Sequence, residues 1–158
     1  MRDKKEMMMT LETLQQLEVV KAIIEIPANS NYKYEVDKLS GRLILDRPLS
    51  LFVPYSYGYI DNTLAEDKDP ADIFVLSKYP IQPLAEVKVK LVGGFLCNDK
   101  GIADDKLVGL LEGEHPSHFD SAFREIEYYL RNYKKEFEVR EVFQRSDFAY
   151  ELYNKNKC

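Results

Sequence analysis

The sequence has no tryptophan, two cysteines and two histidines in 158 residues. Two cysteines, Cys97 and Cys158, do not make a disulfide framework, and they favour a reducing compartment such as the cytoplasm. So few cysteines and histidines also argue against a metal site built from those ligands. No apolar run approaches the length of a membrane span, and Met7-Met8-Met9 is too short for the apolar core of a signal peptide.

An excess of positive charge is missing too, because the formal net charge is −5. This balance argues against a protein that holds nucleic acid or an anionic membrane through bulk positive charge. The sequence contains no GxxxxGK[ST] loop, which disfavours a P-loop nucleotide hydrolase. Hydrophobic residues make up 45% of the chain and charged residues 31%, as in ordinary globular proteins. The length favours one domain, residues 1–158.

Short apolar segments separated by turn residues predict a body rich in β-strands. Tyr32, Tyr34 and Val36 alternate with charged residues, and the Ser40-Gly41 turn leads into a returning strand. The predicted strands are residues 23–26, 32–36, 42–46, 58–60, 73–76, 86–97 and 106–111. Many short antiparallel strands with flanking helices predict a mainly β (α+β) fold, a small closed barrel.

Helices are predicted near the two ends of the chain. Leucines at a spacing of three favour a short helix over residues 10–18. A second helix is expected from Ser117, where Ser117-His118-Phe119-Asp120 resembles a capping box. Its apolar stripe consists of Ala122, Phe123, Ile126, Leu130 and Tyr133. A last amphipathic segment, residues 147–153, is expected to pack back onto the body.

The run Glu66-Asp67-Lys68-Asp69-Pro70-Ala71-Asp72 concentrates carboxylates around a proline. Such a cluster repels itself unless cations neutralise it, and carboxylate oxygens suit hard cations such as Mg²⁺. Pro70 favours a rigid path that lets the acids converge, and the apolar run after Asp72 anchors the loop to a strand. The alternative is a solvated acidic turn without a ligand. We call this run the acid loop.

Further acids and bases are scattered along the predicted strands and at the end of the long helix. Their members are Lys33, Glu35, Arg47, Tyr57, Asp99, Asp104, Tyr133 and Lys134. The turn at Gly101 is expected to bring Asp99 and Asp104 to one end of the barrel. Each member also has an ordinary interpretation taken alone: an exposed strand pair, a surface ion pair, a core tyrosine or a turn acid.

Taken in order, these segments resemble family I soluble inorganic pyrophosphatases. The matching segments are Glu25-Ile26-Pro27, Tyr32-Lys33-Tyr34-Glu35, Gly41-Arg42-Leu43, Leu45-Asp46-Arg47, Tyr57-Gly58-Tyr59-Ile60, Thr63-Leu64-Ala65-Glu66-Asp67, the acid loop, Asp99 with Asp104-Asp105-Lys106-Leu107-Val108, and Asn132-Tyr133-Lys134. The resemblance runs from about Glu25 to Lys134 and implies a five-stranded OB-like barrel with its active site at the mouth. It implies hydrolysis of pyrophosphate to two phosphates with several Mg²⁺ ions, in a homo-oligomer that is a hexamer in the family.

The resemblance also implies a role for each matched residue. Its metal ligands are Asp67, Asp72, Asp99, Asp104 and Glu35. Asp69 corresponds to the base that takes a proton from the attacking water. The phosphate clamp corresponds to Lys33, Arg47, Tyr133 and Lys134, supported by Tyr57 and Lys106, with Glu25 as a peripheral acid.

Three positions depart from the family pattern. Lys68 replaces a small residue of the acid loop, Ala71 replaces a large apolar one, and Val53 stands where many relatives have tyrosine. Two other functions remain as alternatives to pyrophosphate hydrolysis. One is a non-catalytic barrel that binds a phosphorylated ligand or a protein partner. The other, ranked last, is a nucleic-acid-binding OB barrel, which the surrounding acids oppose.

Overall fold

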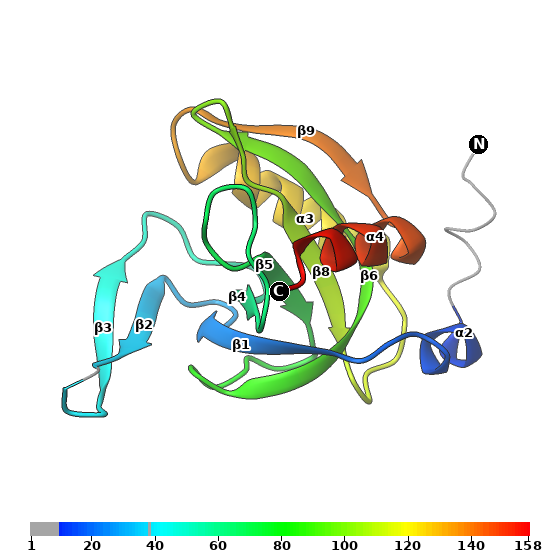
Figure 1. The fold of residues 1–158 in the computed structure, drawn as a ribbon, viewed down its shortest axis with the longest axis horizontal. Coiled ribbons are helices and arrows are strands. Elements are labelled where there is room, and N and C mark those ends of the chain that lie inside the picture. The colour runs from blue at the N-terminus through cyan, green and yellow to red at the C-terminus, as the bar shows by residue number, and fades with distance from the viewer. Residues whose placement is uncertain (1–9, 38) are drawn as a thin grey trace.

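The computed structural model describes residues 10–37 and 39–158, and its centre is a closed ring of five strands. The ring runs β1 (Val20–Ile26), β4 (Ser56–Ile60), β5 (Asp72–Leu76), β8 (Lys106–Leu111) and β6 (Glu86–Asp99), and β6 pairs back with β1 (Figure 1). The predicted five-stranded OB-like barrel is confirmed. Most strands start or end within a few residues of the predicted bounds.

Strand register brings the candidate site residues to one end of the barrel. β5 and β8 are parallel, with Asp72 paired to Lys106, so both side chains begin their strands at the same level. β4 and β5 are antiparallel, which places Tyr57 opposite Phe74 and Tyr59 opposite Asp72. The first residues of β5 and β8 and the last residues of β4 therefore lie at one rim.

Apolar side chains are buried on both faces of the barrel strands and form two clusters. One cluster lies around Ile24, Ile60 and Leu91, and a second lies around Phe74 and Phe95, beneath the long helix. Close approach of β1 and β4 requires Gly58, because a Cβ there would lie 1.8 Å from the carbonyl oxygen of Ile23. Burial of this apolar surface is the main stabilising contribution.

The long helix α3 (Phe119–Asn132) covers one face of the barrel. The buried side chains of the predicted stripe are confirmed, with Tyr129 added, and Tyr133 caps the C-terminal end. The predicted capping box is wrong. His118 occupies the N-cap position in a left-handed conformation, with φ of 61°, and makes no side-chain capping hydrogen bond.

Strand β9 (Phe137–Phe143) was not predicted from the sequence. It pairs with β6, and the register shifts between Leu96 and Cys97, so its buried residues Val139 and Phe143 do not alternate simply with the charged ones. The terminal helix α4 (Ser146–Asn156) packs on β6 as expected and is longer than predicted. The first helix, α2 (Leu11–Gln15), is shorter than predicted and is capped by the Thr10 hydroxyl.

The strands β2 (Tyr32–Val36) and β3 (Leu43–Pro48) form a separate hairpin that projects from the barrel (Figure 1). Lys33 pairs with Arg47, which puts both basic side chains on one face of the hairpin. The other face is apolar and open, since Val36 and Leu45 remain 46% and 48% exposed. This hairpin is the part of the site least supported by the barrel.

Two smaller features of the fold are the lengths of its helices and the state of its cysteine thiols. No helix among the described residues is both long enough and apolar enough to cross a membrane. Both cysteines are free: Cys97 is buried in the core and Cys158 is exposed. Burial raises the pKa of the Cys97 thiol to about 12, so Cys97 is an unreactive core residue. A short strand, β7 (Ile102–Ala103), follows the Lys100-Gly101 turn and pairs with the end of β6.

Candidate active site

The acid loop is a tight turn fixed by hydrogen bonds of its own backbone. The Lys68 amide donates to the Ala65 carbonyl oxygen at 3.0 Å, and the Ala65 amide donates to the Asp69 carbonyl oxygen at 2.8 Å. The Asp69 amide donates to the Asp67 carboxylate at 3.1 Å. At the end of the loop, the buried Thr63 hydroxyl accepts from the Ala71 amide at 2.9 Å. The loop therefore presents Asp67 in a defined position at the rim.

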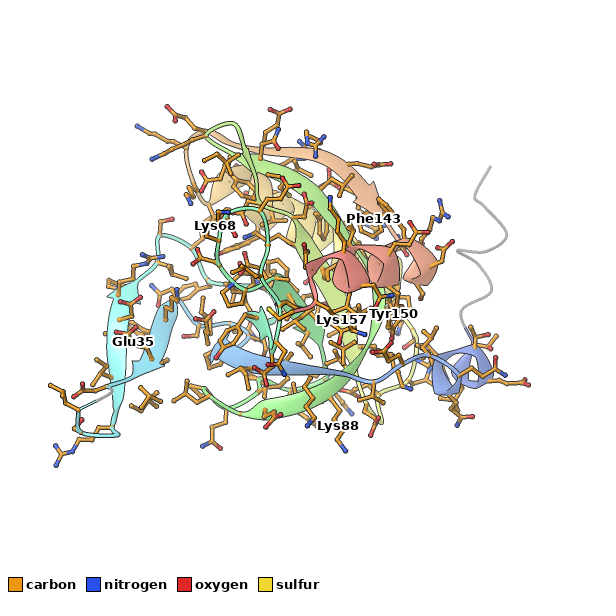
Figure 2. The ribbon with its side chains drawn as sticks, in the orientation of Figure 1. Glu35, Lys68, Lys88, Phe143, Tyr150 and Lys157 are labelled. Atoms are coloured by element: carbon orange, nitrogen blue, oxygen red, sulfur yellow. The ribbon has the colours of Figure 1, made fainter. Side chains whose placement is uncertain are left out.

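Lys68 occupies this turn with φ of 73°, in the left-handed region that glycine adopts at lower cost. A long side chain resists a positive φ, but this resistance does not prevent the turn at Lys68. Figure 2 places Lys68 on the loop above the barrel, where its side chain is exposed. The loop thus carries a cation among its acids at some cost in backbone conformation.

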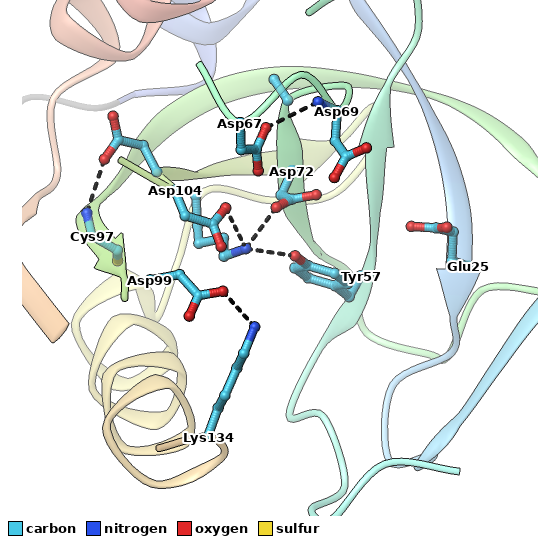
Figure 3. A network of polar contacts seen from close by, with 12 residues as sticks. Glu25, Tyr57, Asp67, Asp69, Asp72, Cys97, Asp99, Asp104 and Lys134 are labelled. Carbon is cyan, nitrogen blue, oxygen red and sulfur yellow. Dashed lines mark hydrogen bonds and ion pairs between the residues drawn. The ribbon is translucent and has the colours of Figure 1, made fainter. Parts of the chain in front are cut away.

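Three carboxylates converge where the acid loop meets the ends of β5 and β8. Asp67, Asp72 and Asp104 each offer an oxygen that lies within 4.8 Å of the others. Asp67 comes from the loop, Asp72 begins β5, and Asp104 precedes β8, so segments far apart in sequence supply them (Figure 3). We call these three residues the carboxylate cluster.

Lys106 contacts two members of the carboxylate cluster and is only 3% exposed. Its ammonium group donates to Asp72 at 2.6 Å, to Asp104 at 3.0 Å and to the Tyr57 hydroxyl at 2.9 Å. Burial by itself lowers the pKa of Lys106, but the negative charge of the surrounding groups, which include Asp72 and Asp104, raises it well above its usual value. Lys106 is thus a permanent cation that balances two buried acids.

The acids of the cluster are held where their charge is costly. Burial raises the pKa of Asp72, and Lys106 opposes that shift through its charge and its hydrogen bond. Burial also raises the pKa of Asp67, and the carboxylates of Asp104 and Asp69 add to it. One ammonium group therefore does not satisfy the cluster, which favours further positive charge at this point.

A second ion pair borders the cluster. Lys134, just beyond α3, donates to Asp99 at 2.5 Å (Figure 3). The other oxygen of Asp99, Oδ1, is buried and has no hydrogen-bond partner. Tyr133 stacks on Tyr129 with ring centroids 4.9 Å apart, and burial raises its pKa well above the usual value. An uncompensated carboxylate oxygen here is suited to an additional cation.

The remaining predicted site residues do not join the carboxylate cluster. Lys33 forms an ion pair with Glu25 at 3.7 Å, and burial raises the pKa of that carboxyl. Arg47 and Glu35 are exposed on the hairpin, where Figure 2 shows Glu35 well to one side of the barrel. Asp69 is exposed at the edge of the acid loop. Asp99 likewise stays outside the group of three carboxylates that the described residues form.

The structure also adds Asp105, which the sequence interpretation treated only as part of a motif. Its carboxylate accepts a hydrogen bond from the Cys97 amide at 2.9 Å, and burial raises its pKa. This bond joins the segment before β8 to the end of β6. A second acid directly after Asp104 was the available signal, and its use as a backbone acceptor requires the tertiary fold.

The donor set fits hard cations. Three clustered carboxylates and a buried unpartnered carboxylate oxygen are all oxygen ligands. No cysteine or histidine belongs to the groups of possible ligands among the described residues. Hard divalent cations prefer such oxygen ligands and use carboxylates together with substrate phosphates. The site therefore combines acids that could hold a metal ion with basic groups that suit a phosphorylated anion.

Comparison with known proteins identifies a family that this chain resembles. The family model described as "Inorganic pyrophosphatase" matches residues 22–156. The inorganic pyrophosphatase of Campylobacter jejuni is 42% identical over 104 residues, which are 65% of this chain and 60% of that protein. The Thermus thermophilus enzyme is 39% identical over 127 residues, covering 74% of this chain and 73% of that one.

Solved structures agree in fold. The Thermus thermophilus inorganic pyrophosphatase superposes with a TM-score of 0.75 and 34% identity, covering 85% of this chain and 87% of that chain. The Coxiella burnetii enzyme gives a TM-score of 0.77 at 27% identity, covering 89% of this chain and 94% of that chain. The family match spans most of the chain and includes every predicted site residue. This chain therefore belongs to the inorganic pyrophosphatase family, a family of metal-dependent hydrolases.

Proposed function

We propose that this chain hydrolyses inorganic pyrophosphate to two phosphates with Mg²⁺ as its cofactor. The observation that carries the proposal is the carboxylate cluster, in which three acids lie within 4.8 Å of one another beside basic groups. Pyrophosphate carries several negative charges that repel a nucleophile. Mg²⁺, when bound, neutralises such charge and lowers the pKa of water.

The acids of the site divide into two roles. Asp67, Asp72 and Asp104 would hold the metal, with Asp99 and Glu35 available to further ions that enter with substrate. Asp69 is proposed as the general base that takes a proton from the attacking water. Its backbone amide donates a hydrogen bond to the Asp67 carboxylate. Its own carboxylate is exposed and lies outside the carboxylate cluster. Glu25 is proposed to position Lys33 from the periphery.

The basic groups would clamp the substrate. Arg47 is suited to two parallel hydrogen bonds with one phosphate, while Lys33 and Lys134 act as compact charges. Tyr133 adds a hydroxyl at the end of α3, and Tyr57 and Lys106 support the clamp from within the barrel. Phosphoryl transfer depends mainly on such positioning and charge stabilisation, so no covalent protein nucleophile is required.

The first test is phosphate release from pyrophosphate. We expect activity in millimolar Mg²⁺, loss of at least 90% of it in excess chelator, and recovery when Mg²⁺ is restored, with Zn²⁺ less effective. Undiminished rates in chelator would exclude the metal mechanism. A folded protein that binds Mg²⁺ yet releases no phosphate would instead favour a non-catalytic barrel that binds a phosphorylated ligand.

A second test concerns Lys68, the cation within the acid loop. Its positive charge should oppose entry of Mg²⁺, although solvent screens it because the side chain is exposed. Replacement by glycine removes the charge and suits φ of 73°. We expect Lys68→Gly to lower the Mg²⁺ concentration for half-maximal activity by about twofold to fivefold, with the saturated rate little changed.

Lys68→Arg is the matched control, because it keeps the positive charge at the same place. It should reproduce the Mg²⁺ dependence of the unaltered protein at low ionic strength. If the Lys68→Gly curve overlays the Arg curve under those conditions, Lys68 has no part in metal affinity.

The assembly and location of the protein are also proposed. We propose a homo-oligomer, a hexamer by family resemblance, in the cytoplasm. Support comes from the open apolar face of the hairpin and from exposed Phe52 and Tyr128, which are 66% and 71% exposed and line a hollow of about 560 Å³ between α3 and the loop after β3. Two unpaired cysteines fit a reducing compartment. A monomer in sedimentation at micromolar concentration would contradict the assembly.

A further inference from the structure

The proposed phosphate clamp is divided between two parts of the molecule. Lys33 and Arg47 lie on one face of the hairpin, in register with each other. Tyr133 and Lys134 follow the last turn of α3, on the barrel. A substrate that contacts both pairs must bridge the hairpin and the barrel, so the relative position of these two parts decides whether all four groups reach it.

The hairpin is weakly held by the barrel. A two-stranded sheet is marginally stable alone, and here every residue of β3 is exposed. The two strands are joined to each other at the root of the hairpin. There the Leu49 amide donates to the Asn31 carbonyl oxygen at 2.6 Å, and the Asn31 side-chain amide donates to the Leu49 carbonyl oxygen at 3.3 Å. The ion pair of Lys33 with Glu25 connects it to β1.

A different contact joins the root of the hairpin directly to the other half of the clamp. The Ser50 hydroxyl donates a hydrogen bond to the Tyr133 carbonyl oxygen at 3.0 Å. Ser50 follows Arg47 by three residues, and Tyr133 precedes Lys134. The residues on either side of Ser50, Leu49 and Leu51, pack against the apolar cluster beneath α3, which also contacts Tyr133.

We propose that Ser50 is a positioning residue for the pyrophosphate clamp. Its hydrogen bond closes the C-terminal end of α3, where a carbonyl group otherwise lacks a helical partner, onto the root of the hairpin. The bond thereby fixes the spacing between Arg47 and Lys134 before substrate arrives. This inference rests on the proposed function for the identity of the ligand. The hydrogen bond from Ser50 to Tyr133, which we call the latch, is a property of the free protein.

Ser50→Ala should remove the latch without disturbing the core, because the side chain is exposed. We expect the KM for pyrophosphate to rise about threefold to fivefold, as expected for one neutral hydrogen bond, while kcat changes less than twofold. Hydrogen exchange of the amides in residues 32–48 of the free protein should become faster. Ser50→Thr, which keeps a hydroxyl, should restore both readings.

Ser40→Ala is the matched control. Ser40 is also an exposed serine of the hairpin, and its hydroxyl donates to Asp37 at 2.7 Å without reaching α3. It should leave the KM unchanged. An unchanged KM and unchanged exchange in Ser50→Ala, or an equal shift in Ser40→Ala, would overturn the proposal. Absence of pyrophosphate hydrolysis in the unaltered protein would refute the proposed function alone, since the exchange experiment tests the latch without substrate.

Discussion

Asp69→Asn should lower kcat for pyrophosphate by about 10²-fold to 10⁴-fold and leave Mg²⁺ affinity almost unchanged. Asparagine has nearly the same shape as aspartate but cannot take a proton, so the variant removes a general base and little else. The bond from the Asp69 amide to Asp67 at 3.1 Å involves the backbone and survives the change. The carboxylate of Asp69 is exposed at the edge of the loop, outside the carboxylate cluster.

Asp72→Asn is the informative comparison, because its carboxylate belongs to the carboxylate cluster. Loss of that charge should weaken Mg²⁺ binding at least about tenfold, in addition to lowering kcat, since a carboxylate ligand is replaced by a neutral amide. It also removes the negative charge that lies 2.6 Å from the Lys106 ammonium group. Calorimetric Mg²⁺ titration beside phosphate-release kinetics separates the two effects. Equal loss of Mg²⁺ affinity in both variants would refute the division of roles.

The strands that carry the cluster could be predicted because their signals are local. Alternation and turn residues bound β2 and β8, and the acid loop leads directly into the apolar run of β5. The same reasoning failed for β9, where charged Glu138, Arg140 and Glu141 hide two buried positions and a register shift breaks the alternation. It also failed at His118, because a left-handed backbone at the N-cap leaves no geometry for the predicted capping box.

The site could be predicted as a set of residues more readily than as an arrangement. Asp67, Asp72 and Asp104 do converge, as the resemblance implied, but their convergence depends on the parallel pairing of β5 with β8. That Asp99 pairs with Lys134, two residues 35 positions apart, could not be read from spacing. Alternation in β2 predicted the strand itself, but it did not show that the hairpin stands away from the barrel with both strands largely exposed. Packing that joins distant segments is decided by the whole chain.

Lys106→Met should have the largest effect on stability, and its size should depend on metal. The lysine is 3% exposed and lies 2.6 Å from Asp72 and 3.0 Å from Asp104. Removing one partner of a buried ion pair leaves uncompensated charge, which costs about 3–5 kcal/mol. Asp72 and Asp104 keep 22% and 12% of their side-chain surface in contact with solvent, so the lower end is expected.

In chelator, the free energy of unfolding should therefore fall by about 3 kcal/mol, which lowers Tm by about 6–12 °C for a chain of this size. Mg²⁺ should recover much of this loss, because an ion that binds only the folded state stabilises it and replaces the missing positive charge. The rise in Tm on adding Mg²⁺ should consequently be larger in Lys106→Met than in the unaltered protein.

Lys88→Met serves as the control, since Lys88 is an exposed lysine on β6 (Figure 2). Surface changes of this kind shift stability by about 0.5 kcal/mol or less, and its response to Mg²⁺ should equal that of the unaltered protein. Thermal melts monitored by circular dichroism, in chelator and in Mg²⁺, measure both quantities. If Lys106→Met melts like Lys88→Met in chelator, Lys106 does not balance the carboxylate cluster. A normal loss of stability without an enlarged Mg²⁺ response would mean that the cation of Lys106 and the metal do not neutralise the same acids.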